Sequence, residues 1–176
     1  MLKSFVRRSC AVALLSGAFV SGLACAQTAT TGTINFTGSV TAVPCEIDTA
    51  ATSGTVTMAK VFANDFTAVG STAGTTSFKI ALKNCGTATN GATVTFTGTA
   101  DSDNATALKT SGGATGVALQ LVDDSGTPVS VGSASKTYTI SEGSNTFNFA
   151  ARYIATNATI GSGNANATAL FALTYK

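Results

Sequence analysis

Short stretches in which apolar and polar residues alternate recur along most of the chain. A period of two residues is typical of β-strands that bury one face, and no long segment shows the 3.6-residue period of an amphipathic helix. The stretches predicted to form strands are residues 33–43, 55–58, 76–82, 92–99, 117–122, 136–141 and 146–155, followed by a terminal strand within 165–176. Many short strands separated by turn-forming residues predict an all-β fold, an antiparallel β-sandwich in one domain.

The terminal strand presents a row of apolar side chains on one face. These are Ala167, Ala169, Phe171, Leu173 and Tyr175, and the sequence stops one residue later. An edge strand exposes unpaired N–H and C=O groups, which readily pair with another chain. We therefore expect whatever covers this edge to be the key to the function.

The first 26 residues have the pattern of a cleaved export signal. Lys3, Arg7 and Arg8 precede an apolar run over 10–20, and the sequence A-C-A at 24–26 fits the small-residue rule for cleavage. The apolar run is shorter than the roughly 20 residues that a membrane-spanning helix needs. The sequence thus predicts an exported mature chain that begins at Gln27 and has no membrane span.

The balance of charge changes when the predicted signal peptide is removed. Three basic residues leave with it, so that the formal net charge falls from +2 to −1. Binding to nucleic acid depends on clustered Lys and Arg side chains. The mature chain therefore offers no support for a nucleic-acid partner.

Two cysteines, Cys45 and Cys85, remain in the mature chain. In an exported domain, a pair of cysteines predicts one disulfide. The alternative is that both are ligands of a metal site, but the sequence contains no histidine to complete such a site.

Catalytic chemistry has little support in this sequence. The absence of histidine excludes Ser-His-Asp and Cys-His sites, and no glycine-rich phosphate motif follows a predicted strand. The carboxylate pairs Asp101/Asp103 and Asp123/Asp124 are interpreted as solvated turn residues, because neither lies in a recognisable ligand loop. We expect no enzymatic activity and no cofactor.

Several motifs occur in a characteristic order along the mature chain. They are G-T-I-N-F-T-G-S-V at 32–40, then Cys45 and Cys85, then G-S-N-T-F-N-F-A-A-R-Y-I-A-T at 143–156, and finally Gly163 twelve residues before Tyr175. In this order the chain resembles the type 1 family of chaperone–usher pilins. The resemblance implies an incomplete immunoglobulin-like antiparallel β-sandwich that lacks its last strand and leaves a hydrophobic groove, with an N-terminal donor-strand extension.

The same resemblance implies how the groove is filled. A periplasmic chaperone first lends it a strand, and the extension of the next subunit replaces that strand at an outer-membrane usher, a form of β-strand addition. The extension is assigned to residues 27–36 and the sandwich domain to 37–176. The donor residues are Thr28, Thr30, Gly32, Ile34 and Phe36, and the residues of the acceptor groove, which also bind the chaperone, are Gly163, Ala167, Ala169, Phe171, Leu173 and Tyr175.

The resemblance makes the chain a structural subunit of a pilus that polymerises by donor-strand exchange. It would be exported through the periplasm to the cell-surface fimbrium, form a homopolymer there and support adhesion. Two alternatives stay open: a minor or adaptor pilin, and an exported immunoglobulin-like binding module. Taken alone, residues 27–33 also read as a polar tail, for which terminal disorder is an alternative to a donor strand.

Overall fold

The computed structural model describes residues 33–38, 45–86 and 90–176. The predicted signal peptide and the predicted donor residues Thr28, Thr30 and Gly32 lie outside these ranges. The described residues belong to two units that divide at Gly38, and each is considered separately. In the first unit, residues 33–38 have no regular secondary structure, and the side chains of Ile34 and Phe36 are exposed.

The second unit is built from β-strands and one short 3-10 helix. Within the described residues its elements are β1 (Glu46–Ile47), η1 (Ala63–Asp65), β2 (Thr72–Cys85), β3 (Ala92–Thr97), β4 (Leu108–Lys109), β5 (Val117–Asp123), β6 (Pro128–Val129), β7 (Gly143–Ala155) and β8 (Leu170–Tyr175). The predicted all-β fold is confirmed.

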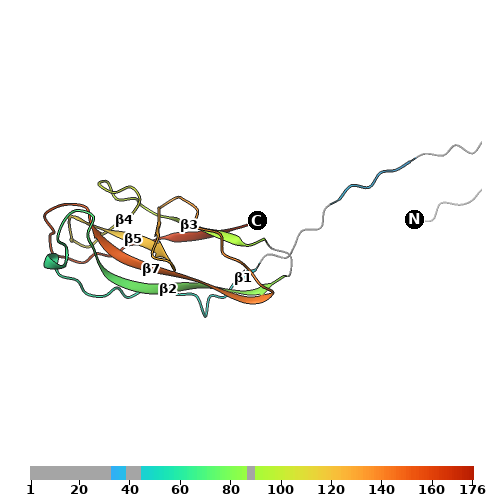
Figure 1. Cartoon of the computed structure of the whole chain (residues 1–176), viewed down its shortest axis with the longest axis horizontal. Coiled ribbons are helices and arrows are strands. Elements are labelled where there is room, and N and C mark those ends of the chain that lie inside the picture. The colour runs from blue at the N-terminus through green and yellow to red at the C-terminus, as the bar shows by residue number, and fades with distance from the viewer. Residues whose placement is uncertain (1–32, 39–44, 87–89) are drawn as a thin grey trace, which may run out of the picture. The chain divides into compact units, whose positions relative to one another are not determined.

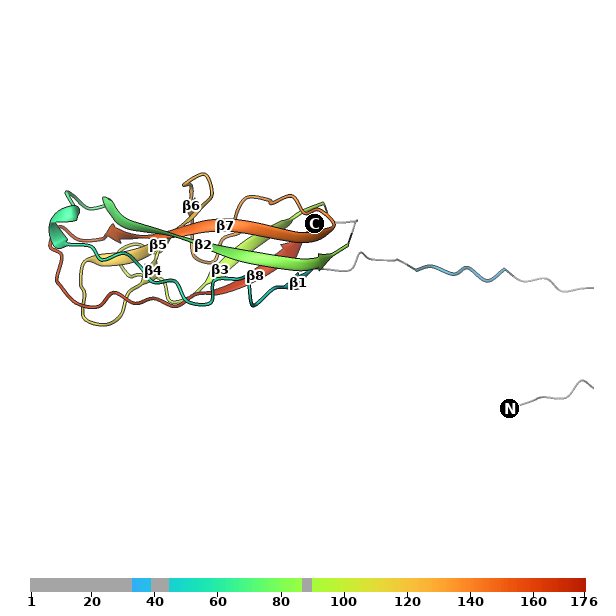
Figure 2. The same ribbon diagram turned by 90° about the horizontal axis from the view of Figure 1, so that it is seen from below.

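The strands form two antiparallel sheets. The larger sheet has the order β1-β2-β7-β5-β4, with β6 also paired to β5, and the smaller sheet consists of β3 and β8. The long pair β2 and β7 forms the spine of the larger sheet, as Figures 1 and 2 show. This two-sheet arrangement is the incomplete immunoglobulin-like sandwich expected from the sequence.

Aromatic side chains join the two sheets in the core. Phe96 of β3 meets Phe149 of β7 edge to face, with ring centroids 5.0 Å apart. Phe78 of β2 stacks on Phe149 at 5.7 Å, and Tyr138 stacks on Phe147 at 4.5 Å. Each such pair contributes about 1 kcal/mol beyond the burial of its area. The core therefore holds the small sheet against the large one.

Four predicted strands differ from the observed ones. Of the strand predicted at 33–43, residues 33–38 form no strand and 39–44 lie outside the described ranges. Residues 55–58 belong to no strand, and residues 136–141 contribute only an isolated bridge between Tyr138 and Ala92. The terminal strand begins at Leu170, although its alternating pattern begins at Ala165. The alternation in these segments reflects one buried face, whereas a strand also requires a hydrogen-bonding partner.

The turn after β5 contains a buried carboxylate, so the interpretation of Asp123 as a solvated residue was wrong. Its Oδ1 atom accepts hydrogen bonds from the Ser125 hydroxyl at 2.6 Å and from the backbone N–H groups of Ser125 and Thr127 at 2.9 Å. These bonds, the Ser125 hydroxyl above all, lower the pKa of Asp123. Lys136 forms an ion pair with the neighbouring Asp124. The turn is thus fixed by charged groups.

Replacing Asp123 with asparagine is expected to lower the free energy of unfolding by about 1 to 2 kcal/mol at neutral pH, because hydrogen bonds to a charged acceptor are lost. The lowered pKa means that the ionised group stabilises the folded state above its ordinary pKa of about 3.9 and loses this effect as the pH falls through the lowered value. Urea unfolding, followed by circular dichroism, should show that the difference in the free energy of unfolding between wild type and Asp123→Asn becomes smaller as the pH is lowered. The control is Asp103→Asn, since the exposed Asp103 carboxylate has no hydrogen bond or ion pair among the described residues. A difference between wild type and Asp123→Asn that is independent of pH would contradict the assignment.

Candidate functional site

A groove of about 1120 Å³ lies between residues 52–63 on one side and 160–171 on the other. Its floor is apolar and comes from both sheets. The floor residues are Phe78 and Ile80 of β2, Phe96 of β3, Leu119 and Leu121 of β5, and Ala151 and Tyr153 of β7. The groove is therefore a gap through which the core of the sandwich reaches the surface.

The first wall of the groove is the segment before η1. Val56, Met58 and Val61 are half-buried, whereas the side chains between them are more exposed. The wall is attached to β2 through the Ser53 N–H, which donates to the Lys79 carbonyl at 3.0 Å. Among the described residues, however, none hydrogen bonds to the backbone of 54–58. This wall can accept a partner strand.

The second wall consists of residues 163–171, which lead into β8. Ala165, Ala167 and Phe171 are half-buried and pack against the core, and Ala169 is more exposed. The Tyr153 hydroxyl donates to the Ala165 carbonyl at 3.0 Å and fixes the wall to the floor. Ala167 and Phe171 of the predicted apolar face thus pack against the core, whereas Ala169 of the same face is exposed.

The edge of β8 that faces the groove has no partner strand among the described residues. On its other edge β8 pairs with β3, where Phe171 lies opposite Phe96 and Leu173 opposite Val94. The two walls thus present two backbone edges across an apolar floor.

Gly163 lies at the start of the second wall, where two chain segments run in close contact. A Cβ atom at this position would lie 2.4 Å from the backbone nitrogen of Ala114 and 2.4 Å from the carbonyl carbon of Gly113. Bridges from Gly113 to Asn164 and from Ser111 to Asn166 hold the two segments together. Only glycine fits here without displacing the wall.

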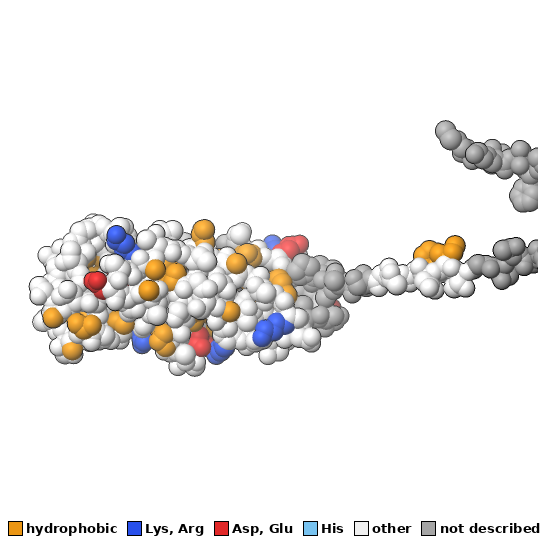
Figure 3. Space-filling view, turned by 90° about the horizontal axis from the view of Figure 1, so that it is seen from above, with side chains coloured by type: hydrophobic (Ala, Val, Ile, Leu, Met, Phe, Trp, Pro, Cys, Tyr) orange, Lys and Arg blue, Asp and Glu red, His pale blue; other side chains and the backbone are white. Residues whose placement is uncertain are grey.

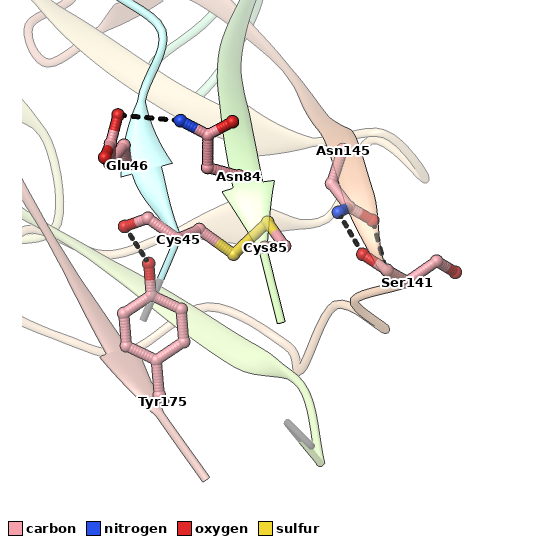
Figure 4. Close-up of a disulfide and its surroundings, with 7 residues drawn as sticks. All are labelled: Cys45, Glu46, Asn84, Cys85, Ser141, Asn145 and Tyr175. Atoms are coloured by element: carbon pink, nitrogen blue, oxygen red, sulfur yellow. Dashed lines mark hydrogen bonds between the residues drawn. A yellow bond between two sulfur atoms is a disulfide. The ribbon is translucent and has the colours of Figure 1, made fainter. Parts of the chain in front are cut away.

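Past one end of the groove, here called the closed end, a hydrogen bond joins the chain that follows the second wall to the chain that precedes the first wall. The Tyr175 hydroxyl donates to the Cys45 carbonyl at 3.2 Å (Figure 4). Burial raises the pKa of Tyr175, so the hydroxyl keeps its proton at neutral pH. Leu173 and Tyr175 pack against the core at this closed end and do not line the groove.

The opposite end of the groove is open. It is lined by Phe62 and Ala63 from the first wall and by Ser162 and Gly163 from the second. Among the described residues, no hydrogen bond joins the two walls there. The open end is therefore where a segment can enter or leave the groove without crossing a bond between the two flanking chains.

The predicted disulfide is present beside the closed end. Cys45 immediately before β1 is bonded to Cys85 at the end of β2, with Cα atoms 4.2 Å apart. Asn84 Nδ2 donates to Glu46 Oε2 at 3.0 Å next to it (Figure 4). The bond rules out both cysteines as metal ligands, and the part of the chain that the structure describes contains no cluster of metal-ligating side chains.

The chemistry of the groove suits an extended peptide. Lys60 is the sole charged side chain among its lining residues. Sequence reasoning identified the second wall but missed the first wall and the floor, although the alternation at 55–58 was visible.

Within the described residues, no helix is long and apolar enough to cross a membrane.

Comparison with known proteins gives one consistent result. Residues 34–176 match the family described as Fimbrial protein. Long polar fimbria protein A of Salmonella typhimurium is 32% identical, with 98% of this chain and 99% of that protein covered. A solved antigen and type I fimbria protein of Burkholderia pseudomallei is 75% identical with a TM-score of 0.62, covering 83% of this chain and 99% of that one. A subunit in a solved chaperone–usher pilus is 26% identical with a TM-score of 0.63, covering 84% and 96%.

Proposed function

Because the chain belongs to the fimbrial protein family and is a structural subunit of a chaperone–usher pilus, we propose that its copies join by donor-strand exchange through the groove. Residues 27–36 of one copy enter the groove of another. The observation that carries this proposal is the apolar floor flanked by two backbone edges that no described strand occupies. As a member of a family of structural subunits, the chain is not an enzyme.

An inserted strand would satisfy both sides of the groove. Ile34 and Phe36 share one face of the donor segment, and burial of each is worth roughly 1.5–3 kcal/mol. The backbone of the donor would pair with the first wall and with the edge of β8. Since the donor leaves by the open end and β8 runs toward the closed end, the donor lies antiparallel to β8.

Other partners follow from the groove and its unpaired backbone edges. The chain polymerises with other pilin subunits in surface fimbriae. Before assembly, a periplasmic chaperone would cover the groove, and an outer-membrane usher would exchange its strand for that of the next subunit. The signal peptide at 1–26 would direct the precursor to the periplasm. The acceptor residues Gly163, Ala167, Ala169 and Phe171 would line the shared binding site, and Leu173 and Tyr175 would support its closed end.

A shaft subunit is the form of pilin that this chain suits best. Donor and acceptor lie in the same chain, so identical copies can join head to tail in an interface that does not close on itself. Such a chain of copies grows into a homopolymeric filament. Immunogold labelling of this subunit along the length of the fibre would support a shaft subunit, whereas labelling confined to the tip would indicate an adaptor.

If residues 27–36 are the donor strand, substitutions on its two faces should have different effects on fibre assembly. The double variant Ile34→Asp, Phe36→Asp should still be captured by the chaperone, because its groove is unchanged, but it should fail to extend fibres. An inserted carboxylate would be buried without a partner, at a cost of several kcal/mol. The measurement is co-purification with the chaperone, followed by electron microscopy of fibres.

The matched control places the same charges on the opposite face. Thr33→Asp with Asn35→Asp changes the net charge equally but leaves the proposed inward face intact. This control should assemble at close to the wild-type level. Equal assembly by both double variants would show that Ile34 and Phe36 are not the inserted residues.

A further inference from the structure

We propose that Phe62 and Val69, at the open end of the groove, form a seat for the disulfide end of the next copy of this chain. The inference rests on the proposed donor-strand exchange and adds a second contact to it. The seat begins at the edge of the donor path, where Phe62 lines the groove, and extends beyond it to Val69, which does not line the groove. It would fix the angle between successive copies.

The seat is apolar and exposed. Phe62 is 60% exposed and Val69 is 59% exposed, although both are large hydrophobic residues. Phe62 immediately precedes η1 and Val69 lies between η1 and β2. Figure 3 shows hydrophobic side chains at this end of the second unit, on the left. Exposed apolar side chains that gather beside a binding groove mark an interaction surface.

Hydrogen bonds with Asp65 fix the backbone of Phe62. Its N–H donates to Asp65 Oδ2 at 2.7 Å, and its carbonyl accepts the Asp65 N–H at 3.0 Å. Lys60 Nζ lies 5.5 Å from the centroid of its ring. Because Phe62 also lines the open end of the groove, the seat is continuous with the proposed donor site.

The length of the connecting chain identifies the occupant. Nine residue-to-residue steps lead from Phe36 to Cys45, and each spans at most about 3.5 Å. With Phe36 bound in the groove of one copy, Cys45 of the incoming copy therefore lies within about 30 Å of it. The donor leaves by the open end, so the disulfide end of the incoming copy is delivered to the end that carries Phe62 and Val69.

The disulfide end offers matching groups. Ile47 of β1 is 41% exposed and can cover an apolar seat. The exposed carboxylates Glu46 and Glu142 lie near the disulfide, since Gly143 pairs with Cys85. Lys60 has no ion-pair partner among the described residues. A carboxylate of the incoming copy would give it one.

Photo-crosslinking in assembled fibres tests this contact. Phe62 is replaced by photoreactive benzoylphenylalanine in the full chain, which is assembled with its chaperone and usher and irradiated. We expect cross-links that mass spectrometry maps to residues 45–48, 83–86 or 141–145 of a second copy. The control carries the same group at Leu170, which is 72% exposed on the outer face of β8 and should not reach those peptides.

The outcomes separate this inference from the donor assignment. Fibres that form normally, but in which position 62 cross-links elsewhere or not at all, would overturn the seat and leave donor-strand exchange intact. A second variant, Val69→Ser, changes the part of the seat that does not line the groove; it should be captured and polymerised but should give fibres that dissociate at a lower urea concentration than wild type. Unchanged resistance to urea would also count against the seat.

Discussion

A chain carrying Cys45→Ser and Cys85→Ser is expected to lose about 4 kcal/mol of folding free energy, because the disulfide closes a loop with a sequence separation of 40 residues. A domain of this size has only about 5–15 kcal/mol in total, and an open groove leaves its core incomplete. The loss is also local. The bond fixes the chain immediately before β1, which leads into the first wall. We expect most of the variant to be lost before assembly.

The measurement is urea unfolding of the isolated chain, together with the yield of complex that co-purifies with the chaperone. A matched control breaks a non-covalent contact at the same place. In Glu46→Ala, the hydrogen bond with Asn84 is lost but the disulfide stays, and the change should be about 1 kcal/mol or less. Normal yield of complex from the double serine variant would show that the disulfide is dispensable for the fold.

Replacing Gly163 with valine is expected to be the second severe change. The added Cβ would lie 2.4 Å from backbone atoms of Gly113 and Ala114, which cannot move aside as a flexible side chain could. Overpacking of this kind costs about 1–3 kcal/mol or more. The clash would also push the second wall away from residues 111–115, and so change the width of the groove at its open end.

Thermal unfolding and chaperone capture should both be measured for Gly163→Val. Gly54→Val on the opposite wall is the matched control, since a Cβ there meets no atom within 4 Å. The control should unfold close to the wild-type temperature. Similar losses from both variants would show that the close approach at Gly163 has no special role.

The strands with clear alternation could be predicted from the sequence, because burial of one face depends on local pattern. β3 and β7 follow their predicted ranges closely. The segments 55–58 and 165–169 have the same pattern but form no ladder among the described residues, and both lie along the groove. Their apolar faces were read correctly. Their missing partner, in the proposed function, belongs to another copy of the chain.

Other parts of the site were beyond a reading of the sequence. The floor residues come from four strands, and their meeting depends on sheet pairings that no local pattern records. The burial of Asp123 was missed because its charge suggested solvent, although Ser125 and Thr127 stand where an aspartate can cap a turn. The family resemblance assigned Gly163 to the acceptor groove, and the structure adds a steric reason for glycine at this position.

The closed end of the groove determines how a fibre of these subunits would carry load. With the hydrogen bond between Tyr175 and Cys45 at one end, a bound donor strand has one unobstructed exit, along its own length. Traction on the fibre would pull the strand toward that exit and shear its hydrogen bonds with both walls together. A strand loaded in this way must break many bonds at once, whereas a strand that is peeled breaks them singly. Each joint would thus resist tension along the fibre far more strongly than it resists lateral opening.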